Sequence, residues 1–326
     1  MIPIMYTLKD KNVVVTGGAG FIGSHLIDRL IKENPNRIVV IDNLFLGNDA
    51  NLNEAKKSFP NLTIYHHNLA DYENTKSIFE KEQIDVVFNL AVIPLPTSLQ
   101  KPVFTFEENA NTVLVVSELL RKKFYKSLIH FSSSEVYGSA EYTPMDENHP
   151  LNPCTPYAAS KASGDHLVLS YVKTFGVDAA IVRPFNNFGP RQNRGKYAGI
   201  IPIVIQQALQ GKPITINGDG CQTRDYIFVK DVADAAVKIF KEEKTRGKIL
   251  NIASGEEISV NDLVKNILRI LKLDIKIEHQ AVRPGDVQRH FADISLAKKL
   301  IGFSPKSDIG GGLQETVEWY KNEFHK

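Results

Sequence analysis

A tyrosine and a lysine four residues apart are the side chains of this sequence best placed for acid–base chemistry. Tyr157 and Lys161 lie in "PYAASKASGDH", and their spacing puts the phenol and the ammonium group on one face of a helix. A free tyrosine has a pKa of about 10, so a phenolate base at neutral pH needs roughly 4 kcal/mol of electrostatic help. A nearby lysine supplies part of that help. Solvent-exposed pairs have the same spacing, so its meaning depends on the rest of the chain.

A glycine-rich loop near the N-terminus has the spacing of a dinucleotide-binding turn. In "VVVTGGAGFIGSH", Gly17, Gly20 and Gly23 follow a β-branched run and open a helical pattern. This spacing allows a tight turn and presents helix N-terminal amides to a pyrophosphate. Asp42 ends the next β-branched run, "VVIDN", where a carboxylate accepts hydrogen bonds from an adenosine ribose. No arginine adjoins Asp42 to bind a 2′-phosphate, so the sequence favours NAD over NADP. The positive nicotinamide ring would add to the effect of Lys161 on Tyr157.

The elements that must position these residues alternate regularly along the first half of the chain. Short β-branched runs predict strands at 12–16, 37–42, 62–67, 85–90, 127–133 and 179–184, and helical patterns between them predict helices at 21–33, 72–82, 104–123 and 157–175. Such alternation specifies right-handed crossovers and a parallel sheet with helices on both faces. We therefore expect an α/β fold with a doubly wound parallel sheet of the Rossmann type.

The second half of the chain predicts a smaller C-terminal α/β lobe that binds the substrate. "NNFGPRQNRGKYAG" and "NGDGCQTRDY" are too long and too rich in Gly, Asn and Arg to be simple connections. The segments at 231–243 and 248–254 look like a return to the first domain, whereas helices are expected in the smaller lobe at 260–271 and 313–324. The predicted NAD-binding domain comprises 1–183 and 228–256, and the predicted substrate-binding lobe comprises 184–227 and 257–326.

Composition excludes several classes of protein. The chain has 326 residues, of which 43% are hydrophobic and 23% charged, and its formal net charge of +2 comes from scattered acids and bases. Nothing indicates a nucleic-acid or anionic-membrane surface. Cys154 and Cys221 lack metal-site spacing, and His66 and His67 have no partner ligands, so no metal is expected. Without a signal peptide or membrane-spanning run, we expect a soluble cytoplasmic protein.

Taken together, the motifs resemble the extended short-chain dehydrogenase/reductase family, specifically its NAD-dependent nucleotide-sugar epimerases and dehydratases. The resemblance runs from end to end through "TGGAGFIG", "NLA", "SSSEVYG", "PYAASK", "RPFNNFGPRQ", "GDGCQTRDYIFVKDVADA" and "RPGDVQRHFAD". It implies that Tyr157 takes the proton of a sugar hydroxyl, Lys161 holds the nicotinamide ribose, and Ser133 shares the proton on the sugar O4. The implied NAD contacts are Gly17, Gly20, Phe21, Ile22, Gly23, Asp42, Asn43, Asn68, Leu69, Ala91, Tyr157 and Lys161.

The resemblance also implies a nucleoside-diphosphate sugar as substrate, most often a UDP-sugar, bound by Asn186, Arg224 and Arg283. Two arginines neutralise a diphosphate by charge-assisted, bidentate hydrogen bonds. The helices at 104–123 and 157–175 form the dimer interface in many family members, so a homodimer is expected.

Two positions depart from the family pattern. The aspartate that usually meets the adenine amine is replaced by Asn68, which still accepts a hydrogen bond but carries no charge. The loop "VIPLPT" between Ala91 and Ser98 is unusually apolar and proline-rich, so the wall near the sugar is expected to differ from that of common UDP-glucose epimerases.

The segment "SSSEVYG" leaves two reactions open. Oxidation of the sugar at C4 needs only Tyr157, Ser133 and NAD, and a 4-epimerase needs nothing more. The 4-keto group acidifies the C5 proton, however, and a carboxylate there drives loss of the C6 hydroxyl. The 4,6-dehydratases carry Asp then Glu after the hydroxyl residue, whereas this chain carries Ser134 then Glu135. We predict catalytic roles for Tyr157, Lys161 and all three residues 133–135, and a dehydratase-type reaction, with a UDP-sugar 4-epimerase as the alternative. The alternative to a catalytic role is that Glu135 only fixes the end of the strand by accepting backbone hydrogen bonds.

Two other classes of protein stay open. A steroid- or alcohol-type dehydrogenase shares the first half of the pattern but has little use for Arg224 and Arg283, and it would release NADH. A non-catalytic NAD sensor or scaffold would have no need of Tyr157, Lys161 and Ser133.

Overall fold

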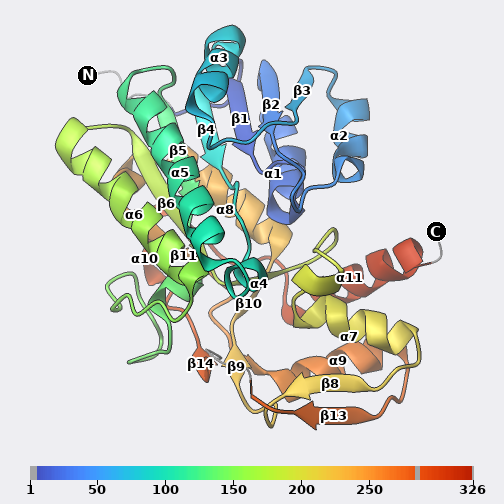
Figure 1. Cartoon of the computed structure of the whole chain (residues 1–326). Coiled ribbons are helices and arrows are strands. Elements are labelled where there is room, and N and C mark those ends of the chain that lie inside the picture. The colour runs from blue at the N-terminus through green and yellow to red at the C-terminus, as the bar shows by residue number, and fades with distance from the viewer. Residues whose placement is uncertain (1–5, 283–286, 325–326) are drawn as a thin grey trace.

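The protein is built around a seven-stranded parallel sheet. The structure is a computed structural model that describes residues 6–282 and 287–324 (Figure 1). The sheet order is β11-β6-β5-β4-β1-β2-β3. The strands are β1 (Asn12–Thr16), β2 (Arg37–Ile41), β3 (Leu62–Tyr65), β4 (Val86–Asn89), β5 (Ser127–Phe131), β6 (Ala179–Pro184) and β11 (Ile249–Ile252). Strand order reverses between β1 and β4, which creates the crevice where ligands bind in open α/β sheets. The predicted doubly wound sheet is confirmed.

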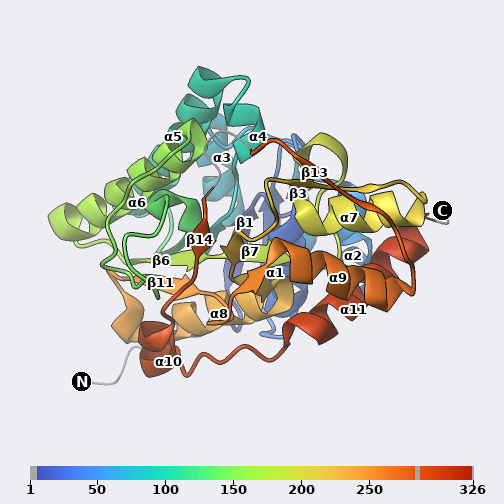
Figure 2. The same cartoon turned by 90° about the horizontal axis from the view of Figure 1, so that it is seen from below.

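Alternating side chains bury both faces of the sheet. Val13 and Val15 of β1 join one hydrophobic core, whereas Val14 between them joins the core on the opposite face. Both faces are therefore covered, as parallel sheets require. One face is covered by α1 (Phe21–Ile31), α2 (Asn53–Ser58), α8 (Val229–Lys241) and α10 (Ser295–Ile301). The other is covered by α3 (Tyr72–Glu82), α5 (Pro102–Arg121) and α6 (Pro156–Phe175). In Figures 1 and 2, α5 and α6 lie side by side along that face.

A second, smaller core lies beyond the carboxyl ends of the strands. It is formed by apolar side chains of α7 (Ile200–Leu209), α9 (Val260–Leu271) and α11 (Ile309–Phe324), together with the strands that they cover. In Figure 2 the three helices are gathered on one side of the molecule. The short strands pair as β7 (Asn186–Phe188) with β10 (Tyr226–Phe228), β8 (Ile214–Asn217) with β13 (Ile277–Gln280), and β9 (Thr223–Arg224) with both β12 (Ile258–Ser259) and β14 (Arg289–His290).

The division of the chain into two domains stays a prediction, and one helix bears on it. The predicted boundaries put α10 in the smaller lobe, but Ala297 of this helix is fully buried in the core of the large sheet. The remaining elements are the short helices α4 (Leu95–Ser98), η1 (Asp49–Leu52), η2 (Ser134–Tyr137), η3 (Gly195–Tyr197) and η4 (Glu243–Thr245). No helix within 6–282 and 287–324 is long and apolar enough to cross a membrane.

Candidate active site

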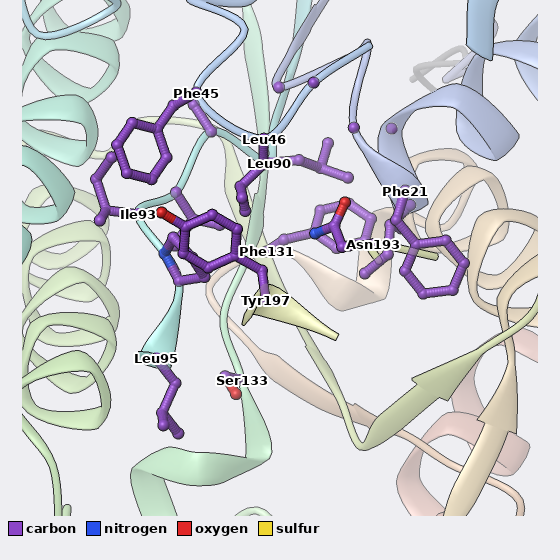
Figure 3. A pocket seen from close by; sticks show the side chains of 18 of the residues that line it. Phe21, Phe45, Leu46, Leu90, Ile93, Leu95, Phe131, Ser133, Asn193 and Tyr197 are labelled. Carbon is purple, nitrogen blue, oxygen red and sulfur yellow. The ribbon is translucent and has the colours of Figure 1, made fainter. Parts of the chain in front are cut away.

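A pocket of about 470 Å³ opens where the carboxyl ends of the sheet strands meet the smaller lobe (Figure 3). It is lined by the glycine loop, the ends of β2 to β5, the N-terminal part of α6 and the segments after β6. Most of the predicted site residues meet here: Gly17, Gly20, Phe21, Ile22, Gly23, Asp42, Asn43, Asn68, Leu69, Ala91, Ser133, Glu135, Tyr157, Lys161 and Asn186.

The glycine loop has no room for side chains at two of its three positions. Gly17 has a φ of +64°, and a Cβ atom there would lie 3.0 Å from the backbone nitrogen of Ala91. A Cβ on Gly23 would lie 2.3 Å from the carbonyl oxygen of Gly17, closer than any real contact. The loop therefore passes tightly under the start of α1, whose first turn has neither a side-chain cap nor an acidic residue. The amides of this turn are left to meet a pyrophosphate, which fits the predicted dinucleotide.

Asp42 is held rigidly at the end of β2. It is 7% exposed, its Oδ2 accepts a hydrogen bond from the Ala19 amide at 3.0 Å, and its Oδ1 accepts one from the Leu44 amide at 2.8 Å. Burial raises the pKa of this carboxyl group. Each oxygen keeps a lone pair, so the carboxylate can also accept hydrogen bonds from ribose hydroxyls.

The end of β3 pairs with helix α5 in a way that the sequence did not reveal. Oδ1 of Asn68 accepts a hydrogen bond from the Ala70 amide at 3.1 Å, and its Nδ2 donates to Oε2 of Glu108 at 3.1 Å. Glu108 lies on α5 and also lines the pocket. Two adjacent glutamates on a helix are typical of a solvent-exposed surface, so no sequence signal pointed to this carboxylate.

Tyr157 and Lys161 lie at the start of α6, on its pocket face. Thr155 caps this helix, because its side chain accepts a hydrogen bond from the Ala158 amide at 3.1 Å. Burial raises the pKa of Tyr157 to about 12, while its hydrogen bond with Ser133 lowers the pKa and the charge of Glu135 raises it. Burial also lowers the pKa of Lys161 to about 8, opposed by Asp165. The phenol is therefore neutral in this protein alone, and it needs added positive charge to become a base.

The segment after β5 brings two of its three predicted residues into the pocket. Ser133 caps η2, and its Oγ accepts a hydrogen bond from the Glu135 amide at 3.3 Å. Ser133 and Glu135 both line the pocket, on either side of a residue that does not. Ser134 is 3% exposed, and its carbonyl oxygen lies 3.1 Å from Nε2 of His290. Ser134 does not line the pocket, so nothing in the structure supports its predicted catalytic role, which stays a prediction.

The predicted substrate ligands are only partly gathered. Asn186 lines the pocket and donates through Nδ2 to the Asp225 carbonyl oxygen at 3.0 Å. Arg224 lies on β9 outside the pocket lining, where its Nη1 donates to the Thr223 carbonyl oxygen at 2.9 Å. Arg283 lies outside the described residues.

The apolar loop noted in the sequence forms one wall of the pocket. Ile93, Pro94, Leu95 and Pro96 all line it. In Figure 3 the side chains of Leu95 and Ser133 lie on the same side of the pocket, and the Tyr197 ring lies across its centre. The Tyr197 ring centroid is 6.0 Å from that of Phe45, which joins the two loops over the pocket. Tyr197 and Phe45 were not predicted, because they come from loops without a motif.

A single amide ties this wall to α6. Asn109 of α5 accepts a hydrogen bond from the Ile93 amide at 2.7 Å through Oδ1, and its Nδ2 donates to Oγ of Ser160 at 2.9 Å. Asn109 is 3% exposed. Because Ser160 adjoins Lys161, the apolar wall and the Tyr157–Lys161 pair are held at a fixed separation.

Comparison with known proteins agrees with this fold and pocket. The family model described as GDP-mannose 4,6-dehydratase matches residues 14–316. The chain therefore belongs to this family of extended short-chain dehydrogenase/reductases, which are NAD-dependent nucleotide-sugar epimerases and dehydratases. The predicted family and enzyme class are confirmed.

The relatives of this chain differ in the reaction that their names give. A putative UDP-glucose 4-epimerase of Methanocaldococcus jannaschii is 36% identical, over 95% of this chain and 98% of that protein. The UDP-N-acetylglucosamine 4-epimerase of Methanobrevibacter ruminantium, solved with UDP-N-acetylmuramic acid, is 38% identical, with a TM-score of 0.89 over 97% of this chain and 99% of that one. The dTDP-glucose 4,6-dehydratase DesIV of Streptomyces venezuelae, solved with NAD, is 28% identical, with a TM-score of 0.89 over 96% and 98% of the two chains. Both dehydratases and epimerases among the structural neighbours were solved with NAD, which confirms the predicted cofactor.

Proposed function

We propose that the protein uses NAD to oxidise C4 of a nucleoside-diphosphate hexose and then eliminates water across C5 and C6. The observation that carries the proposal is a carboxylate, Glu135, in the same pocket as the Ser133–Tyr157 pair. Oxidation at C4 and simple inversion do not need this carboxylate. In an elimination, by contrast, a base beside the 4-keto sugar removes the acidified proton at C5.

The steps can be assigned to residues of this chain. Tyr157 takes the proton of the C4 hydroxyl with Ser133 as its hydrogen-bond partner, and the charge of Lys161 stabilises the phenolate. NAD, when bound, accepts the C4 hydride and later returns it to the sugar. Glu135 takes the C5 proton and delivers it to the departing C6 oxygen, which leaves as water. The hydride is returned to C6, and protonation of C5 balances the proton that Tyr157 removed from O4.

A second candidate is a UDP-sugar 4-epimerase. Two observations favour it: the relatives at 36% and 38% identity bear epimerase names, and Ser134, where dehydratases carry an acid, is buried outside the pocket. In this reaction Tyr157, Lys161 and Ser133 act as above, the 4-keto sugar turns over, and the hydride returns to the opposite face of C4. Both candidates use a nucleoside-diphosphate sugar, and the names of the relatives favour UDP.

Mass spectrometry followed by proton NMR separates the two candidates. The purified protein is incubated with NAD and a panel of UDP-, dTDP- and GDP-hexoses, including N-acetylated ones. Loss of the mass of one water supports the dehydratase. An unchanged mass with inverted C4 proton couplings supports the epimerase. Release of stoichiometric NADH contradicts both and indicates a dehydrogenase.

We further propose that the protein is a homodimer that pairs through α5 and α6. Val103, Phe106 and Leu114 of α5 are 67%, 40% and 42% exposed, and they leave apolar surface on the outer side of this helix pair. Such a surface is typical of a subunit contact.

A further inference from the structure

Asn68 and Glu108 form a pair at one end of the pocket that carries a specific hydrogen-bonding pattern. The Ala70 amide fixes Oδ1 of Asn68 at 3.1 Å, which turns the amide nitrogen of Asn68 toward Oε2 of Glu108, also at 3.1 Å. Both residues line the pocket. Nδ2 has a second hydrogen, and the carboxylate has further lone pairs. The pair therefore offers a donor and an acceptor side by side to a ligand.

The position of the pair identifies the part of the ligand that it meets. Strand β3 lies beside β2 at the edge of the sheet, and the His67 amide donates to the Asp42 carbonyl oxygen at 3.2 Å. Asn68 therefore lies next to Asp42, on the side toward the sheet edge. In this fold, a carboxylate at the position of Asp42 binds the adenosine ribose. The base attached to that ribose extends toward the end of β3, where Leu69 provides a buried apolar contact.

The charge in this subsite is on the helix and not on the strand. An aspartate at position 68 would put two carboxylates at hydrogen-bonding distance, which disfavours the ionised form of both. An asparagine removes this repulsion and supplies a donor. Adenine presents its 6-amino group as a donor next to ring-nitrogen acceptors, so its edge is complementary to the carboxylate and amide of this pair. Hypoxanthine has a carbonyl in place of the 6-amino group, so an acceptor would face the carboxylate.

We propose that Glu108 recognises the 6-amino group of the adenine of NAD, and that Asn68 donates to the neighbouring ring nitrogen. The inference rests on the proposed NAD-dependent function. It assigns to a residue of α5 the negative charge that the strand end lacks, and it predicts that the protein discriminates adenine from hypoxanthine.

Isothermal titration calorimetry of the apoprotein with NAD and with nicotinamide hypoxanthine dinucleotide tests the proposal without substrate or turnover. We expect NAD to bind at least about tenfold more tightly, as for a hydrogen bond to a charged group. In Glu108→Gln the side-chain amide can rotate and donate to the hypoxanthine carbonyl, so the preference should fall to about threefold or less. The matched control is Glu107→Gln, an exposed neighbour on the same helix outside the pocket, which should keep the wild-type ratio.

A double variant distinguishes the loss of this specific contact from a general loss of structure. Asn68→Asp combined with Glu108→Gln returns the charge to the strand end, and it should restore the preference for NAD. Equal binding of both dinucleotides by the wild-type protein overturns the inference and leaves the proposed reaction intact. An unchanged ratio in Glu108→Gln also overturns it. If neither dinucleotide binds, the cofactor of the proposed function is itself wrong, and the inference fails with it.

Discussion

Asp165 of α6 and Arg183 of β6 form an ion pair in which Oδ2 and Nη2 are 2.5 Å apart, and both side chains are at most 1% exposed. The same Oδ2 accepts a hydrogen bond from Oγ of Ser132 at 2.7 Å. Asp165 lies one helical turn after Lys161, and its charge partly offsets the lowering of the Lys161 pKa by burial. Asp165 thus joins the helix that carries the proposed base both to β6, through Arg183, and to the segment after β5 that carries Ser133, through Ser132.

Replacing Asp165 by Asn should strongly destabilise the fold. The guanidinium group of Arg183 would be left buried without a counter-charge, which costs roughly 3–5 kcal/mol. Urea denaturation followed by circular dichroism measures the change. The exposed ion pair between Glu54 and Lys57 gives the control, since Glu54→Gln should leave the free energy of unfolding unchanged. A wild-type midpoint for Asp165→Asn would contradict this account.

Lys161 should make the stability of the apoprotein depend on pH. Its pKa is lowered to about 8 in the folded protein from 10.5, so the unfolded chain binds more protons between these values. Stability contributed by this site therefore rises with pH above about 8, and the charged lysine is destabilising below it. Relative to Lys161→Met, the wild type should gain roughly 2 kcal/mol between pH 7 and pH 9.5. Parallel urea titrations of both proteins at the two pH values test this, and a constant difference would refute it.

Glu135→Gln distinguishes the proposed elimination from an inversion. The amide keeps the shape of the side chain but cannot remove a C5 proton. For a dehydratase, C4 oxidation should continue while water loss falls by about a hundredfold or more, with the near-ultraviolet absorbance of reduced nicotinamide accumulating. Glu256→Gln, on an exposed loop outside the pocket, should behave as wild type. Inversion at C4 that survives in Glu135→Gln would identify an epimerase.

Gly23→Ala should prevent tight binding of NAD. The added methyl group would meet the Gly17 carbonyl oxygen at 2.3 Å, so the loop must move away from the start of α1. Close-packed backbone cannot absorb such a contact, and we expect at least about a tenfold loss of affinity by calorimetry. Gly310→Ala is the control, since a Cβ atom there would meet Oδ1 of Asp308 at an ordinary contact distance of 3.7 Å. Unchanged NAD affinity in Gly23→Ala would show that the loop is not the binding element.

Leu114→Glu should convert the proposed dimer to a monomer. Leu114 is 42% exposed on α5, and a charge buried in a subunit contact is costly. Sedimentation velocity at several concentrations measures the change. Leu273, 39% exposed and following α9, provides a control of equal exposure, and Leu273→Glu should leave the assembly unchanged. A wild-type protein that sediments as a monomer would refute the prediction.

The sequence revealed those parts of the molecule that depend on local periodicity. Strand β1 and helix α1 were predicted because β-branched residues and glycines repeat at short spacing, and Tyr157 and Lys161 because they are one turn apart. The Asn68–Glu108 pair could not be predicted in this way. Its members are far apart in the chain, and they meet only because α5 packs over the face of the sheet, against β4 and β5.

The same limit applies to residues whose surroundings the sequence does not show. Ser134 stands between Ser133 and Glu135 in the sequence, but the turn of η2 places it outside the pocket. The Asp165–Arg183 pair was missed because its members lie on two different elements, α6 and β6, and nothing in the sequence pairs them. Charge pairing across elements needs the fold before it can be recognised.

The chain leaves the large sheet after β6 and returns to it only with β11 at Ile249–Ile252. Between the two strands lie β7, α7 and β8, which belong to the smaller core. During synthesis, the glycine loop and Asp42 leave the ribosome long before the strand that completes their sheet. The two predicted lobes therefore could not be expressed as two consecutive fragments, and a nascent chain cannot complete the large sheet until it has also made much of the smaller core.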